Sequence, residues 1–138
     1  MAQRKVRVNL KDVKRRSLSL SLVLIAATIA LGLALRMAPL GLPAFVVKYG
    51  GSTMWALMIY WLITTMLPTM RLPAAVVSAG LVASAVECFK LYRSPGVDAF
   101  RETLAGTLIL GRYFSMADLV AYWLAIAAGA LIDHRIRN

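Results

Sequence analysis

The sequence predicts an all-α membrane protein with four transmembrane helices and a short interfacial or re-entrant helix between the third and the fourth. Apolar residues make up 60% of the chain and the mean hydropathy is +0.72, which is typical of membrane proteins rather than soluble domains. Four apolar runs approach the length of about 20 helical residues that crosses a hydrocarbon core. No repeat or linker divides the chain, so we expect one helical membrane domain, residues 17–138, after a basic juxtamembrane segment, residues 1–16.

The first predicted transmembrane helix covers about residues 17–35. Basic residues followed by an apolar run are also typical of a secretory signal peptide. The run from Leu18 to Leu35 is longer than the roughly 7–15 apolar residues of such a peptide, and no cleavage site of the A-x-A kind follows it. We therefore predict a retained helix, with the segment 1–16 on the cytoplasmic side.

The second and third predicted transmembrane helices cover about residues 52–67 and 73–91. Ser52 is expected to cap the start of the second helix, and Pro68 lies just beyond its end. Pro73 occupies the first turn of the third helix, a position that proline favours because its missing N–H needs no partner there.

A short helix is predicted at about residues 98–110, where 13 residues would span only about 20 Å. Asp98, Arg101 and Glu102 share one face of this helix at i, i+3 and i+4, and Gly111 supplies a helix stop. The segment is too short to cross the membrane, so it either lies in the interface or re-enters the bundle. The sequence leaves both placements open.

The fourth predicted transmembrane helix covers about residues 115–132. Ser115 and Asp118 fit a capping box, in which the serine side chain accepts a hydrogen bond from the backbone and the acid reaches back to the N–H of the cap. Asp118 is therefore expected to have at least a partly structural role.

The basic residues are arranged as topology signals rather than as a nucleic-acid surface. The net charge is +10, but the cations cluster at the N-terminus and at the ends of apolar runs, which favours contact with anionic lipid. Placing the N-terminus inside gives ten Lys and Arg residues on that side against six outside, so both termini are predicted to be cytoplasmic. The ten lie in residues 1–16 and at Arg71, Arg135 and Arg137, and the six are Arg36, Lys48, Lys90, Arg93, Arg101 and Arg112.

Two acids lie within or at the edge of predicted membrane helices. Glu87 is 14 residues beyond the start of the third helix and Asp118 lies near the start of the fourth, so both should reach the outer third of the bundle. A charged group facing lipid is costly, so such groups normally face the interior and pair. We expect an ionic cluster of Glu87, Arg101, Arg112 and Asp118 at the outer face, with Lys90 as a further candidate partner of Glu87. This cluster could equally be a purely structural lock between helices.

The sequence carries none of the common catalytic or metal-binding signatures. Cys88 is the single cysteine and excludes both an internal disulfide and a multi-cysteine metal site. The single histidine, His134, lies beyond the apolar part of the last helix. No P-loop, dinucleotide fingerprint, G-x-S-x-G or HExxH motif is present, so we expect no metal, no cofactor and no catalytic residue.

The stretch VECFKLYRSPGVDAFRETLAGTLILGRYFSMADLVAY, residues 86–122, resembles the bacterial family of small integral membrane proteins known as domain of unknown function 2809. The family pattern is E-x-x-Q on one helix, a short apolar segment, and L-G-x-x-F-x-x-x-D before the last helix. Glu87 matches the first acid, Gly111 and Phe114 match the turn, and Asp118 matches the last acid, whereas Lys90 stands where the family has Gln. The layout is also distantly similar to VanZ-like proteins. The resemblance implies a multi-pass protein of the bacterial inner membrane and leaves its activity open.

The leading functional hypothesis is a non-enzymatic membrane protein that binds an anionic lipid, a lipid-linked head group or a membrane partner. The predicted cluster would form the site, because Arg offers phosphate planar, bidentate donors. The alternatives are an accessory subunit or homo-oligomer, an enzyme with Glu87 or Asp118 as general base, and a transporter. Nearby cations favour ionised acids and so argue against base catalysis, and acids gathered at one face form no relay across the membrane.

Overall fold

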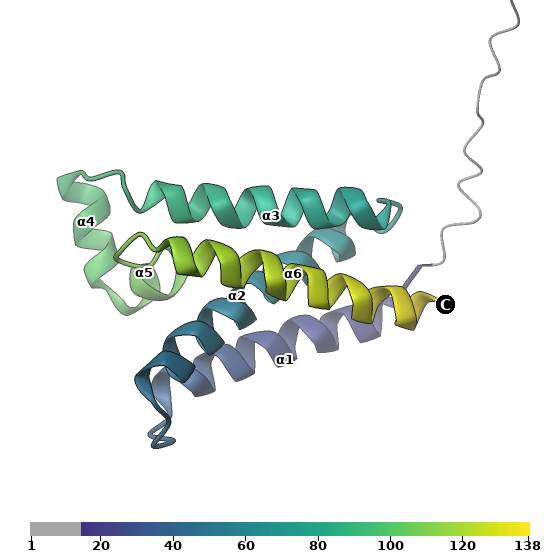
Figure 1. Cartoon of the computed structure of the whole chain (residues 1–138), viewed down its shortest axis with the longest axis horizontal. Coiled ribbons are helices and arrows are strands. Elements are labelled where there is room, and N and C mark those ends of the chain that lie inside the picture. Colours follow the sequence, from purple (N-terminus) through teal and green to yellow (C-terminus); the bar gives the residue numbers. More distant parts are fainter. Residues whose placement is uncertain (1–14) are drawn as a thin grey trace, which may run out of the picture.

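The computed structural model describes residues 15–138, and every regular element in that range is a helix (Figure 1). The all-α prediction is therefore confirmed for this part of the chain. Most of the predicted basic segment 1–16 lies outside the described residues. The helices are α1 Leu18–Met37, α2 Ala44–Met66, α3 Leu72–Phe89, α4 Pro95–Glu102, α5 Leu104–Ile109 and α6 Met116–Arg137.

The four long helices form an antiparallel bundle around α2 (Figure 1). Helix α2 contacts α1, α3 and α6, and α3 also contacts α6. The start of α1 and the end of α6 lie at one end of the bundle, which we call the termini end, and the short helices α4 and α5 lie at the opposite end, the α5 end (Figure 1). An even number of long antiparallel helices brings both ends of the described chain to the same side.

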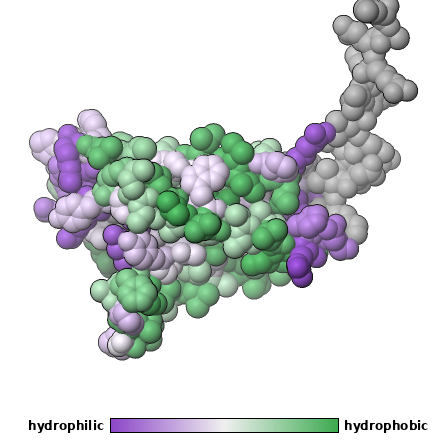
Figure 2. Space-filling view, viewed as in Figure 1, coloured by the Kyte–Doolittle hydropathy of each residue, from purple (hydrophilic) through white to green (hydrophobic). Residues whose placement is uncertain are grey.

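Three of the helices, α1, α3 and α6, are long and apolar enough to cross a membrane, rather than the four that the sequence predicted. Helix α2 is long enough at 23 residues, but its many Gly, Ser, Thr, Tyr and Trp residues lower its hydropathy. Figure 2 shows the apolar band that the bundle presents, with hydrophilic residues gathered at both ends. The surface pattern is that of a membrane protein.

Helix α2 begins at Ala44, eight residues before the predicted start at Ser52. Ser52 lies inside the helix, where its hydroxyl donates to the carbonyl of Lys48 at 3.1 Å, so the prediction that it caps the helix is wrong. The glycines before it do not break the helix. At Gly51 a Cβ atom would lie 2.8 Å from Nε of Arg36, which shows that this glycine allows the Arg36 side chain to lie against α2.

The predicted helix 98–110 is divided into α4 and α5 at Thr103. Thr103 is extended, and its Oγ1 caps α5 by accepting a hydrogen bond from the N–H of Gly106 at 3.0 Å. At Gly106 a Cβ would lie 1.8 Å from the carbonyl oxygen of Phe100, so only glycine lets α5 fold back against α4. The predicted stop at Gly111 is confirmed by its φ of +69°.

The core consists mainly of small residues on α3 and α6 packed around Tyr60 and Trp61 of α2. Ala75, Ala79 and Ala83 of α3 are almost completely buried. Small side chains let helix backbones approach closely, which is how membrane helices gain packing contacts. Helix α6 ends at Arg137, five residues beyond the predicted end, and therefore includes residue 133.

Candidate functional site

Glu87 is completely buried at the end of α3, and all its hydrogen-bonding partners lie at the α5 end. Its Oε1 accepts the backbone N–H of Ser115 at 2.7 Å, and its Oε2 accepts the hydroxyl of Tyr122 at 2.8 Å. The cation that neutralises it is Lys90, whose Nζ lies 2.6 Å from Oε2. Glu87 therefore joins α3 to the start of α6 and satisfies an otherwise orphan N–H at the helix start.

Ser115 caps α6, because its Oγ accepts the N–H of Asp118 at 3.3 Å. The second half of the predicted capping box is wrong, since Glu87 rather than Asp118 accepts the N–H of Ser115. The Asp118 carboxylate instead lies 3.3 Å from the hydroxyl of Ser52 on α2, and it shares the hydrogen of that hydroxyl with the carbonyl of Lys48. The first turn of α6 is thus held to α3 by one acid and to α2 by another.

Among residues 15–138, Arg101 forms an ion pair with neither Glu87 nor Asp118, so the structure does not join the predicted cluster through ion pairs. Its side chain is 2% exposed, and its guanidinium donates to the carbonyls of Phe89 at 2.8 Å and Tyr92 at 2.7 Å. It also pairs with Asp98 at 3.1 Å. Arg101 therefore satisfies carbonyls at the end of α3 and holds α4 beside them. Sequence spacing did not reveal that the Arg101 side chain would reach the carbonyls at the end of α3.

Arg112, the remaining predicted member, is exposed and lines a cavity of about 230 Å³ at the α5 end, which we call the basic cavity. The polar residues that line it include Arg36, Lys48, Ser52, Lys90, Arg112 and Asp118. Four of these are cations and one is an acid. Within residues 15–138, Lys90 is paired with Glu87, whereas no carboxylate pairs with Arg36, Lys48 or Arg112.

Arg36 and Lys48 were counted as topology signals in the sequence and were not assigned to the cluster. They come from the end of α1 and the start of α2, far in sequence from α5. The signal that could have placed them was the predicted α1–α2 turn, because a four-helix arrangement brings this turn to the same side as the segment between the third and fourth helices.

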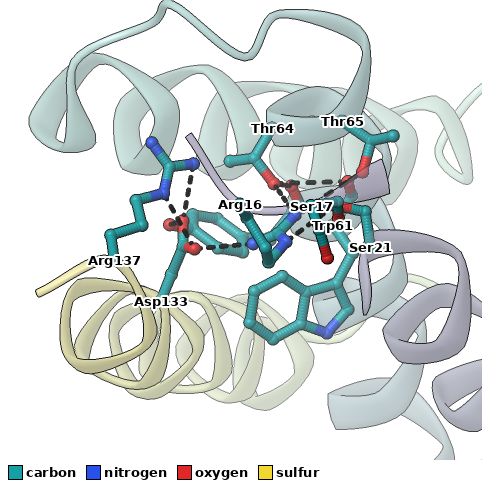
Figure 3. Close-up of polar contacts among 9 residues, drawn as sticks. Arg16, Ser17, Ser21, Trp61, Thr64, Thr65, Asp133 and Arg137 are labelled. Carbon is teal, nitrogen blue, oxygen red and sulfur yellow. Dashed lines mark hydrogen bonds and ion pairs between the residues drawn. The ribbon is translucent and has the colours of Figure 1, made fainter. Parts of the chain in front are cut away.

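A second polar site lies at the termini end and centres on Asp133, which is completely buried (Figure 3). Its carboxylate pairs with Arg16 at 2.6 Å and with Arg137 at 2.9 Å. The hydroxyl of Tyr60 donates to it at 2.9 Å. The site therefore joins the residue before the α1 cap, the middle of α2 and the end of α6.

The Arg16 side chain is only 2% exposed, although the sequence placed it in a basic juxtamembrane segment with no assigned contacts. Its guanidinium donates to Ser21 at 2.8 Å and Thr64 at 3.0 Å and lies over the ring of Trp61, with 4.9 Å from Cζ to the ring centre (Figure 3). Sequence reasoning missed this site because it ended the last helix at residue 132. Helical spacing of Asp133 with the buried Ile126 and Gly129 could have revealed it.

Apolar helices of membrane length and acids paired inside the bundle define a small helical membrane protein. The residues that the structure describes hold no group of three or more His, Cys, Asp or Glu residues suited to a metal ion. Residues 41–126 match the family described as protein of unknown function (DUF2809), and because this match covers more than half of the chain, the protein belongs to that family. The resemblance found in the sequence is confirmed. No solved structure matches the chain.

The matched segment contains one of the two polar sites. Ser52, Glu87, Lys90 and Asp118 all lie within residues 41–126, whereas the Arg16 and Asp133 pair lies outside it. Of the charged residues that line the basic cavity, only Arg36 lies outside the matched segment, so most of this site belongs to the family region, and we take the basic cavity as the candidate functional site.

Proposed function

We propose that the protein binds the phosphate-bearing head group of an anionic lipid, or of a lipid-linked molecule, in the basic cavity. The observation that carries the proposal is the group of three cations, Arg36, Lys48 and Arg112, that share this cavity without a carboxylate partner in residues 15–138. Guanidinium groups donate to phosphate in a planar, bidentate geometry. A cavity in which four cations outnumber one acid also concentrates anions.

In this proposal α2 is the fourth membrane span. Its 23 residues rise about 34 Å, enough to cross the hydrocarbon core. Its polar and aromatic residues Tyr60, Trp61 and Thr64 are buried against the other helices, so they lower the hydropathy of α2 without facing lipid. A central helix surrounded by protein needs less hydropathy than one surrounded by lipid.

We further propose that the termini end faces the cytoplasm and the basic cavity faces outward. The surplus of Lys and Arg in the N-terminal sequence, in the α2–α3 turn and in the last turn of α6 supports this orientation. The cavity would then lie at the depth of the outer-leaflet head groups of a bacterial inner membrane.

The surroundings of Glu87 support binding rather than catalysis. A general base needs a free lone pair that faces its substrate. Three donors, from Ser115, Tyr122 and Lys90, occupy the two oxygens of Glu87, and the side chain is completely buried. Its role in the proposal is to position the start of α6, and with it Asp118, on the wall of the cavity.

The proposal predicts that the double variant Arg36→Gln, Arg112→Gln retains less phosphatidylglycerol than the unmodified protein in native mass spectrometry. Each lost charge-assisted contact weakens retention by about tenfold. The matched control is Arg71→Gln, Arg135→Gln, which removes the same charge at exposed positions of the termini end. Equal retention by the two double variants contradicts the proposal.

A further inference from the structure

An apolar groove of about 230 Å³ opens beside the basic cavity. Its apolar walls come from three helices: Ile29 and Leu33 on α1, Met54 and Met58 on α2, and Leu108 and Ile109 on α5. Arg36 lines both the groove and the basic cavity, so the two spaces meet at its side chain. A smaller space of about 20 Å³, lined by Arg36, Leu108 and Lys90, lies between them.

The groove exists because α5 does not pack on the α1–α2 pair. Among helices of the described chain, the contacts of α5 are with α4, whereas α1 and α2 pack closely on each other. Leu108 and Ile109 therefore face α1 across open space. The α5 wall is itself fixed by Gly106, which holds α5 against the backbone of α4.

The groove is apolar even where its wall carries a hydroxyl. Oγ1 of Thr28 donates to the carbonyls of Leu24 and Ile25 in its own helix, at 3.0 and 2.9 Å, so its hydrogen is not directed to an occupant. From Thr28 to Arg36 the wall rises about 12 Å along α1, from the middle of the helix to its charged end. A hydrocarbon chain that starts at a head group in the interface follows the same direction.

We infer that the groove holds one hydrocarbon chain of the anionic phospholipid whose phosphate occupies the basic cavity. The inference rests on the proposed function and extends it, because it gives the ligand two contact regions joined at Arg36. Charge complementarity selects this occupant, because a chain in the groove brings its own phosphate within reach of Arg36, which pairs with no carboxylate in residues 15–138. In a zwitterionic lipid the ammonium group offsets the charge of that phosphate. Binding then depends on chain length as well as on head-group charge.

Filling the groove tests this inference directly. Ile29→Trp enlarges a wall residue that is 41% exposed, so the larger ring can enter the groove without displacing the core. Leu31→Trp is the matched control, since Leu31 is 56% exposed on the same helix and does not line the groove. Leu33→Trp, from the same wall as Ile29, repeats the test in case the first variant folds poorly.

The probes are long-chain phosphatidylglycerol and its dihexanoyl form, which has the same head group on chains too short to fill the groove. Retention and competition are measured by native mass spectrometry, with unfolding temperature as a check on folding. We expect Ile29→Trp to weaken retention of the long-chain lipid by about tenfold relative to Leu31→Trp. Retention of the dihexanoyl form should differ between the two variants by no more than about twofold.

Each other outcome separates the inference from the proposed function. The groove inference is wrong if Ile29→Trp and Leu31→Trp retain the long-chain lipid equally. The proposed function still stands in that case if the double variant Arg36→Gln, Arg112→Gln loses both the long-chain and the dihexanoyl lipid. If the unmodified protein retains neither form of phosphatidylglycerol more strongly than it retains phosphatidylcholine, the proposed function fails and the inference fails with it. A dimer that only Ile29→Trp dissociates would assign the groove to a second copy of the chain and overturn the inference.

Discussion

Glu87 is the buried acid whose hydrogen bonds and ion pair hold the helices together at the α5 end. Its carboxylate joins the end of α3 to both the backbone N–H of Ser115, the cap of α6, and the side chain of Tyr122. The sequence correctly indicated that this acid needs a cation, and Lys90 was among the candidates because i and i+3 share a helix face. The choice among Lys90, Arg101 and Arg112 depended on the path of α4, which no local pattern encodes.

Glu87→Gln is expected to destabilise the bundle by about 3–5 kcal/mol, because it leaves the 9% exposed Lys90 side chain without its counter-ion. Unfolding in mixed detergent micelles measures the change. Adding Lys90→Met to Glu87→Gln should restore part of the lost stability. The control is Glu102→Gln, which neutralises an exposed acid. A cost for Glu87→Gln no larger than for Glu102→Gln would contradict the assigned role.

Asp133 provides a matched comparison at the termini end. Asp133→Asn leaves Arg16 and Arg137 without a carboxylate in a site where the acid is 0% exposed, so we expect a loss of about 3–5 kcal/mol. Asp98 also lies between two arginines but is 38% exposed, and its buried partner Arg101 keeps its hydrogen bonds to the carbonyls of Phe89 and Tyr92. Asp98→Asn should therefore cost less, about 1 kcal/mol. Unfolding of both variants in the same micelles checks the difference, and equal losses would show that burial does not control the effect.

At the scale of elements, the sequence identified the long helices better than their ends. The start of α2 was placed at Ser52 because two glycines before it resemble a break, but the helix continues through Gly51, against which the Arg36 side chain lies. The end of α6 was placed at residue 132 because charge follows, whereas Asp133 and Arg137 continue the helix as an i, i+4 pair. The first error arose from a tertiary contact that local signals do not show, and the second from ending the helix where the apolar run ends.

The close approach of α5 to α4 depends on Gly106, and this dependence can be tested by substitution. Gly106→Ala is expected to displace α5, since the new Cβ would overlap the carbonyl of Phe100, and to cost about 1–3 kcal/mol. Gly96→Ala is the control because nothing lies within 4 Å of its Cβ position. Hydrogen exchange of residues 95–110 measures the effect. Faster exchange in Gly106→Ala alone is the expected result, and similar exchange in both variants would contradict it.

At the scale of the whole molecule, composition alone predicted the helical membrane class, because apolar content and mean hydropathy need no knowledge of contacts. The number of spans was harder to obtain. Helix α2 lies in the centre of the bundle and carries buried polar residues, so its hydropathy reflects protein neighbours as much as lipid. Counting apolar residues cannot separate these two environments.

Thiol labelling of intact cells distinguishes four spans from three. In a Cys88→Ser background, four spans with a cytoplasmic N-terminus predict that Arg112→Cys reacts with an impermeant reagent and that Arg71→Cys reacts only after lysis. With α2 outside the membrane, α3 would cross in the opposite direction, and the two positions would exchange their behaviour. Labelling of Arg71→Cys in intact cells, with Arg112→Cys protected, would therefore contradict the proposed topology.

Asp118 and Asp133 lie on the same buried face of α6, fifteen residues and about 22 Å apart, and each is tied to α2 by a hydroxyl. One residue inserted between them would rotate one attachment by about 100° relative to the other, because a helical turn holds 3.6 residues. The length of α6 between its two anchors is thus fixed by geometry. Related chains that keep both acids should tolerate substitutions along this stretch far more readily than insertions or deletions.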